Sequence, residues 1–155
     1  MTIKYKEVVD ALQSARHIYL IGDGGSAALA DHFACDLLKN CLLPAISLCS
    51  NAAILTAIAN DYSSDEIFSR QLNVLWQEGD LLMIFSTSGN SRNLIKAAPI
   101  AEKSIITVVG GGILSIGEWP GKICCFIKGE DQMSIEDDML VFCHEVARRL
   151  MCKKK

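Results

Sequence analysis

The feature that most restricts the fold is the uninterrupted apolar run Leu81-Leu82-Met83-Ile84-Phe85. A strand that is apolar on both faces belongs in the middle of a parallel sheet whose two faces are covered by helices. Other short apolar segments alternate along the chain with helical patterns, which is typical of a doubly wound sheet with right-handed crossovers. We therefore expect one α/β domain over residues 1–155, with three α/β/α layers and a five-stranded parallel sheet in the flavodoxin-like order 2-1-3-4-5.

The expected elements follow one another without internal repeats or linkers. Strands are predicted at about 17–21, 44–48, 81–85, 104–109 and 122–127. Helices are predicted at about 3–15, 26–40, 51–58, 64–77, 91–102 and 134–152, the third of them capped by Asn51. Polar or glycine-rich loops are expected at 60–64 and 110–112 and around Pro120.

Composition restricts the class of function. Half of the residues are hydrophobic, 21% are charged and the net charge is -3, so the basic excess typical of nucleic-acid binders is missing. The chain start lacks a signal-peptide core, and no apolar run approaches the roughly 18 residues that span a bilayer. We expect a cytoplasmic protein that binds neither nucleic acid nor membrane.

The seven cysteines are odd in number and show no C-x-x-C spacing. Several lie within apolar runs, which favours reduced, buried thiols over a disulfide framework or a four-cysteine zinc site. No cysteine has an evident cationic setting that would lower its thiol pKa, and a reactive cysteine stays open as an alternative.

Two polar loops follow the first and third predicted strands. In Gly22-Asp23-Gly24-Gly25-Ser26, the glycines let the backbone approach an anion, and the free amides of the following helix offer donors. In Ser86-Thr87-Ser88-Gly89-Asn90-Ser91, four hydroxyls form a neutral cradle for a phosphate dianion. The predicted strand order places both loops at one crevice, where ligands of such sheets bind. The alternatives are a simple connecting turn and an ordinary hydroxyl-capped loop.

These loops, together with His32-Phe33-Ala34, resemble the sugar isomerase (SIS) domain family and, within it, the phosphoheptose isomerases. The similarity runs from about residue 16 to the C-terminal end and includes Asn60-Asp61 and the segment 67–70. It implies a phosphosugar ligand, a homo-oligomer (dimer or tetramer) with active sites near subunit interfaces, and no nucleotide cofactor. The residues it implies for substrate binding are Gly24, Gly25, Ser26, Asn60, Asp61, Ser86, Thr87, Ser88 and Ser91.

The resemblance also places the family's catalytic carboxylate on Asp36 and its catalytic histidine on His144. An aldose–ketose isomerisation moves a proton between adjacent carbons through a cis-enediol, which needs a base at the carbon and an acid at the oxygens. Asp36 would remove the proton, and His144 would handle the other transfer. Aspartate is one methylene shorter than the family's glutamate, so its reach decides whether the activity survives.

Some family members bind zinc at this place. The matching residues form a mixed N/O set, namely His32, Asp36, Glu136 and His144. His32 and Asp36 share one helix face, but helical spacing places Asp137 rather than Glu136 on the His144 face. The alternatives are a hydrogen-bonded His32, a buried structural His144, and acidic residues at 136–138 that favour a helix start.

The chain departs from the family at several site positions. The family's asparagine in the first loop is Asp23, its glutamine near the last helix is Glu136, and its polar residues after the loop serine are apolar at 27–29. The leading hypothesis is a phosphosugar isomerase of the sedoheptulose 7-phosphate type. The rival is a non-catalytic SIS module that binds a phosphosugar or a protein partner as a regulator, and a purely structural oligomerisation protein fits the hydroxyl-rich loop poorly.

A second reason to expect an oligomer comes from the last predicted helix, whose apolar residues extend over more than one narrow face. They include Met139, Leu140, Phe142, Val146 and Leu150.

Overall fold

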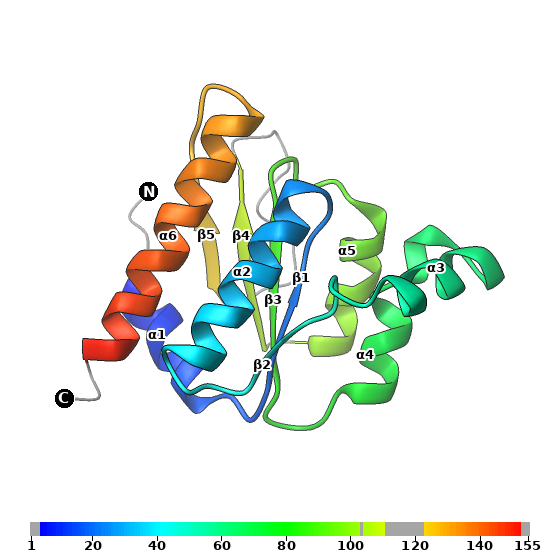
Figure 1. Cartoon of the computed structure of the whole chain (residues 1–155), viewed down its shortest axis with the longest axis horizontal. Coiled ribbons are helices and arrows are strands. Elements are labelled where there is room, and N and C mark those ends of the chain that lie inside the picture. The colour runs from blue at the N-terminus through cyan, green and yellow to red at the C-terminus, as the bar shows by residue number, and fades with distance from the viewer. Residues whose placement is uncertain (1–3, 103, 111–122, 153–155) are drawn as a thin grey trace.

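Five parallel strands form the centre of the computed structural model, which describes residues 4–102, 104–110 and 123–152 (Figure 1). The strands are β1 (Ile18–Ile21), β2 (Ala45–Ser47), β3 (Leu81–Ser86), β4 (Ile105–Val109) and β5 (Ile123–Phe126). Their order is β2-β1-β3-β4-β5, and every pairing is parallel. The predicted fold class and strand order are therefore confirmed. Every residue of β1, β3 and β4 is buried, as continuous apolar strands covered on two faces require.

Helices cover both faces of the sheet. They are α1 (Tyr5–Ser14), α2 (Gly25–Lys39), α3 (Ala52–Asp61), η1 (Ser64–Glu66), α4 (Ser69–Leu75), α5 (Arg92–Ala97), η2 (Ala98–Ala101) and α6 (Gln132–Cys152), where η denotes a 3-10 helix. One core contains buried residues of α1, α2 and α6, and the other contains those of α4, α5 and η2. In Figure 1, α2 and α6 lie side by side in front of the sheet, while α4 and α5 lie to the right of β1 and β3.

Three predicted helical segments differ from the structure. Asn60 and Asp61, expected in a loop, are the last two residues of α3. The helix expected at 64–77 is divided into η1 and α4, and η1 begins where the Ser63 hydroxyl accepts a hydrogen bond from the Asp65 amide. The helix expected at 91–102 changes to a 3-10 turn at its second half, where Pro99 supplies no N–H. The predictions at 111–112, Pro120 and 153–155 lie outside the described residues.

The apolar face of α6 is used within the subunit. Four of the five residues from which we expected an oligomer, Met139, Phe142, Val146 and Leu150, are at most 1% exposed, and Leu140 packs against the same core. These side chains therefore give no support to self-association. Among the described helices, even this longest one is not apolar enough to cross a lipid bilayer.

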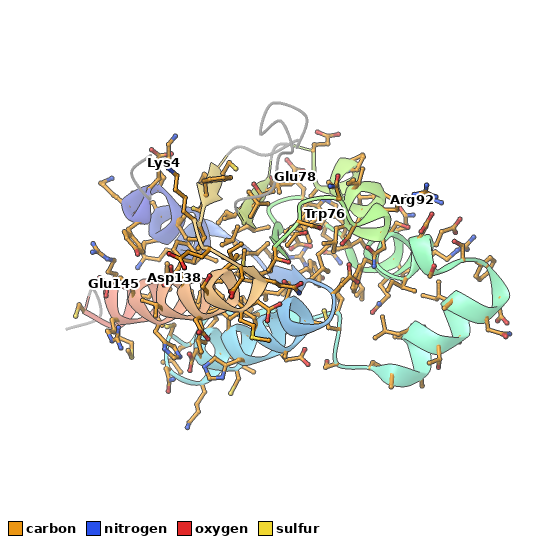
Figure 2. All side chains as sticks on the ribbon, turned by 90° about the horizontal axis from the view of Figure 1, so that it is seen from above. Lys4, Trp76, Glu78, Arg92, Asp138 and Glu145 are labelled. Atoms are coloured by element: carbon orange, nitrogen blue, oxygen red, sulfur yellow. The ribbon has the colours of Figure 1, made fainter. Side chains whose placement is uncertain are left out.

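Helix α3 projects from the side of the molecule away from α6 (Figures 1 and 2). The Asn51 side chain caps it as predicted, accepting from the amides of Ala53 and Ile54 at 3.2 and 3.3 Å. Ile58 is its only buried residue, although its sequence is largely apolar. Ile54 and the following Tyr62 are 38% and 59% exposed. The Arg70 guanidinium lies 3.3 Å from the centre of the Tyr62 ring, so the uncovered apolar surface is that of the helix itself, at Ile54.

Thr107 in β4 gives a first testable prediction. It is fully buried, and among the described residues its Oγ1 has no hydrogen-bond partner. An unpaired buried hydroxyl costs about 1–3 kcal/mol, so Thr107→Val is expected to raise the free energy of unfolding by about 1 kcal/mol in urea titration. Thr56→Val is the control and is not expected to raise the free energy of unfolding, because the exposed Thr56 hydroxyl already donates to the Ala52 carbonyl at 2.7 Å. A loss of stability in Thr107→Val would mean that the hydroxyl has a partner.

Candidate functional site

Two histidines and a carboxylate meet where α2 packs against α6. His32 Nε2 and His144 Nε2 are 2.9 Å apart, although the two residues are 112 positions apart in the chain. Asp36 Oδ2 lies 3.5 Å from His32 Nε2 and 3.7 Å from His144 Nε2. The predicted catalytic pair, Asp36 and His144, is therefore in contact, and the ring of His32 stands edge-on to that of His144.

Asn40 orients the carboxylate of this cluster. Its Nδ2 donates to Asp36 Oδ1 at 2.9 Å, so the other oxygen, Oδ2, faces the histidines. The side chain of Asp36 is 17% exposed, whereas those of His32 and His144 are 50% and 38% exposed. A ligand approaching from solvent thus meets two imidazole edges with a fixed carboxylate oxygen beneath them.

The same three residues fit a divalent metal ion. Their donor atoms all lie within 4.8 Å of one another. At zinc–ligand distances of about 2.0–2.1 Å, tetrahedral donors are about 3.3 Å apart, close to the observed separations. Two nitrogens and one oxygen leave a fourth position for water or a substrate oxygen, as in catalytic zinc sites.

Glu136, the fourth predicted metal ligand, lies elsewhere along the seam between α2 and α6. A methyl group on Gly25 would overlap its carboxylate, so Glu136 packs on the first turn of α2. Gln132 Nε2 donates to its Oε1 at 3.2 Å. Helices α2 and α6 run parallel, so this contact is about two turns, or roughly 10 Å, from the histidine pair. The structure brings together three of the four residues.

The loop at 86–91 leaves the carboxyl end of β3 as predicted. Ser86 Oγ accepts from the Gly89 amide at 2.9 Å, and Gly89 has φ 68°, a conformation that favours glycine. Ser91 takes the N-cap position of α5, yet within the described chain its hydroxyl makes no capping hydrogen bond. The ordinary capping role proposed as the alternative is thus not used at Ser91. Arg92, the next residue, projects outward in Figure 2.

The glycine loop leaves β1 at the same edge of the sheet, because β1 and β3 are parallel neighbours. Gly24 has φ 57° and forms the N-cap of α2, so its conformation favours glycine at this turn. Ser26 is buried, at 3% exposed. Asp23 is not free, because its Oδ1 accepts from Asn93 Nδ2 at 2.7 Å. Both loops therefore lie at one edge, as the strand order predicted.

A cysteine also lies at this edge. Cys49 Sγ donates to the Gly22 carbonyl at 3.4 Å. Burial raises the pKa of its thiol to about 11, so it is protonated at neutral pH. The described cysteines are not joined in disulfides, and Cys35 and Cys152 are exposed rather than buried as expected.

Asn60 and Asp61 are not part of the cluster within one subunit. Both are exposed at the end of α3, where Asn60 Nδ2 donates to Asp61 Oδ1 at 2.9 Å. Figure 2 shows α3 on the far side of the molecule from α6. The structure therefore does not bring these two predicted substrate-binding residues to the cluster.

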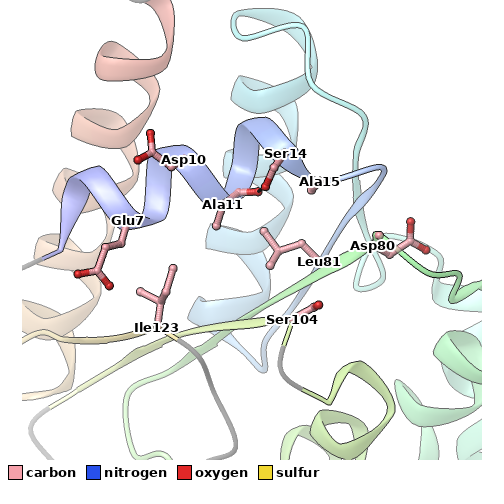
Figure 3. A pocket seen from close by; sticks show the side chains of 10 residues that line it. Glu7, Asp10, Ala11, Ser14, Ala15, Asp80, Leu81, Ser104 and Ile123 are labelled. Atoms are coloured by element: carbon pink, nitrogen blue, oxygen red, sulfur yellow. Dashed lines mark hydrogen bonds between the residues drawn. The ribbon is translucent and has the colours of Figure 1, made fainter.

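A separate cavity of about 610 Å³ lies under α1, at the amino ends of β3 and β5 (Figure 3). Its carboxylates have cationic or histidine partners: Glu7 pairs with Lys4, Asp10 with Lys6, and Asp80 with His17. Ligands of doubly wound sheets bind at the opposite, carboxyl ends of the strands. This cavity is therefore not the candidate site.

Two residues of the site were missed from the sequence. Asn40 follows Asp36 by one helical turn, and i, i+4 spacing is a local pattern that would have found it. Asn93 reaches Asp23 across 70 positions, and no local pattern indicates that contact.

The sequence matches a family model described as "SIS domain" over residues 5–111. A phosphoheptose isomerase from Campylobacter concisus is 36% identical over 151 residues, covering 91% of this chain and 78% of that protein. Another from Shewanella sp. (strain ANA-3) is 45% identical over 125 residues, covering 72% of this chain and 64% of that protein. This chain thus spans somewhat under two thirds of the second relative.

Solved structures show the same similarity. A phosphoheptose isomerase from Francisella tularensis has a TM-score of 0.87 and 26% identity, covering 97% of this chain and 85% of that one. The enzyme from Neisseria gonorrhoeae has a TM-score of 0.82 and 28% identity, covering 94% of this chain and 84% of that one.

Proposed function

Because this chain belongs to the SIS domain family, we propose that it is a phosphosugar isomerase that interconverts a ketose phosphate and an aldose phosphate of the sedoheptulose 7-phosphate type. The observation that carries the proposal is the contact of Asp36 and His32, on the helix that follows the glycine loop, with His144 of α6. The similarity to phosphoheptose isomerases favours this function over that of a non-catalytic binding module.

In the proposed mechanism, the phosphate is bound by Ser86, Thr87, Ser88 and Ser91, with Gly24, Gly25 and Ser26 forming the other wall. Asp36 accepts the proton from the carbon next to the carbonyl, and the electron pair of that C–H bond forms the enediol double bond. His144 donates a proton to the carbonyl oxygen. A proton then returns to the former carbonyl carbon, and the hydroxyl on the carbon that was deprotonated first loses its proton and becomes the new carbonyl, which completes the isomerisation.

We also propose that zinc binds to His32, Asp36 and His144. When bound, the ion would act as a Lewis acid toward the sugar oxygens. With zinc bound, His144 Nε2 would be a ligand and could not donate a proton, so polarisation of the carbonyl oxygen by the ion would replace that proton transfer. The bond from Asn40 would still keep one oxygen of Asp36 directed into the site. We do not include Glu136 in this ligand set, because it packs on Gly25.

Proton exchange tests the proposed function. Incubation with sedoheptulose 7-phosphate in deuterated water is expected to place deuterium at the carbon that loses its proton, detected by NMR. The result that would overturn the enzyme hypothesis is an absence of exchange with every member of a phosphosugar panel that still binds. Such a result would favour the regulatory binding module.

Metal uptake tests the zinc site separately. After supply of zinc and dialysis, elemental analysis is expected to give about one ion per wild-type chain and little in His32→Ala, because a ligand is lost. His17→Ala is a matched control, because His17 pairs with Asp80 at the opposite end of the sheet. Equal metal content in all three proteins would contradict the site.

We further propose a homo-oligomer, a dimer or a tetramer, in which the apolar surface of α3 is covered. Its exposed Ile54 supports this, as does the position of Asn60 and Asp61 away from the cluster. Light scattering at micromolar concentration is expected to give a mass above 16.9 kDa. A monomer would refute it. The cytoplasmic location stays a prediction.

A further inference from the structure

We propose that Asn93 is a positioning residue that holds the carboxylate of Asp23 and thereby joins the two loops of the crevice. Its expected effect on substrate rests on the proposed function. Asn93 Nδ2 donates to Asp23 Oδ1 at 2.7 Å, across 70 residues of sequence. Asp23 belongs to the loop after β1, and Asn93 to the first turn of α5, directly after the loop at 86–91. This hydrogen bond therefore links the glycine loop to the helix that follows the loop at 86–91, and through that helix it joins the two loops.

The two hydrogen bonds of the Asn93 side-chain amide fix which end is oxygen and which is nitrogen. Its Oδ1 accepts from the Leu94 amide at 2.9 Å, and a carboxylate can only accept hydrogen bonds, so the NH2 group faces Asp23. Helix α5 is itself held in place, because Leu94 is fully buried and Lys96 forms an ion pair with Glu66 at 2.8 Å. Asn93 thus extends from an anchored helix to the glycine loop.

The charge of Asp23 explains why this contact matters. A carboxylate near a loop that binds a phosphate dianion repels the ligand, and the repulsion grows as the separation falls. A charge-assisted hydrogen bond fixes the carboxylate in one position and partly compensates its charge. Asn93 is therefore expected to determine how tightly the phosphate ester binds. The chemistry at Asp36 should be little affected.

An exchange of the two side chains tests the inference. Asn93→Asp places two carboxylates against each other, whereas Asp23→Asn combined with Asn93→Asp restores the bond with donor and acceptor reversed. For sedoheptulose 7-phosphate, Asn93→Asp is expected to raise KM about tenfold and to change kcat by less than about twofold. The double variant is expected to recover most of the KM. Asn73→Asp, an exposed site on α4, controls for the added charge.

A fall in kcat without a change in KM, or a double variant that folds but recovers nothing, would overturn the inference. Urea unfolding of Asp23→Ala, Asn93→Ala and their combination provides a readout that needs no substrate. We expect the unfolding equilibrium constant of the double variant to differ about threefold to tenfold from the value calculated by adding the two single effects on the free energy of unfolding. If the two single effects simply add, the bond does not join the loops. If the wild type neither binds nor isomerises the sugar, the proposed function fails, and this unfolding cycle alone decides the inference.

Discussion

Replacement of Asp36 by asparagine is expected to lower kcat for sugar phosphate isomerisation by about a thousandfold, within the range found when a general base is removed. Asparagine keeps the size of the side chain and can still accept the bond from Asn40. It cannot take up a proton from carbon. The loss should therefore appear in kcat and in deuterium exchange, while circular dichroism stays unchanged.

Two variants complete the Asp36 experiment. Asp31→Asn removes a charge from an exposed position of the same helix and is expected to keep kcat within about twofold. Asp36→Glu keeps a carboxylate and extends it by one methylene, so it should retain far more activity than Asp36→Asn. Metal content is measured in each, because Asp36 is also a proposed ligand. A loss below about tenfold in Asp36→Asn would assign the base to another residue.

Replacement of Phe33 by alanine is expected to lower the free energy of unfolding by about 3–5 kcal/mol, the usual cost of removing a buried phenyl ring. Phe33 follows His32 in α2 and is fully buried, with its ring edge-on to Phe85 at a centroid distance of 6.3 Å. Phe85 precedes Ser86, so this aromatic pair connects the helix that carries the cluster to the strand that leads into the loop at 86–91. Urea titration gives the measurement.

Phe33→Leu is the matched variant, because it keeps most of the apolar volume and should cost clearly less. Val74→Ala, at a site 84% exposed on α4, should have little effect on stability. A Phe33→Ala protein as stable as the wild type would show that α2 can repack without this ring.

The sequence predicted the sheet well because each strand is identified by residues that are adjacent in the chain. Continuous apolar runs such as 81–85 identify buried strands, and the loops that follow them carry the polar residues. The cluster was placed through the family resemblance, and the i, i+4 spacing of His32 and Asp36 agreed with it. Helical spacing indicated that Glu136 does not share the His144 face, but it did not indicate where Glu136 lies. Its contact with Gly25 depends on how α2 and α6 align, which no periodicity within either helix determines.

The apolar residues of α6 illustrate the same limit. A helix that is apolar on more than one face can be covered by its own subunit or by another, and the sequence does not distinguish these cases. Here the subunit itself covers them. The uncovered apolar helix is α3, whose sequence alone gives no reason to expect exposure.

The contact between His32 and His144 joins two helices that are synthesised at different times. The first histidine lies in the second helix of the chain and the second in the last, so both loops of the crevice are made well before the cluster can exist. A growing chain that has folded through β4 contains the loop at 86–91 but lacks one of the two proposed proton-transfer groups. The proposed proton transfers would thus require α6 to dock beside α2, and a chain that ends before α6 would lack His144.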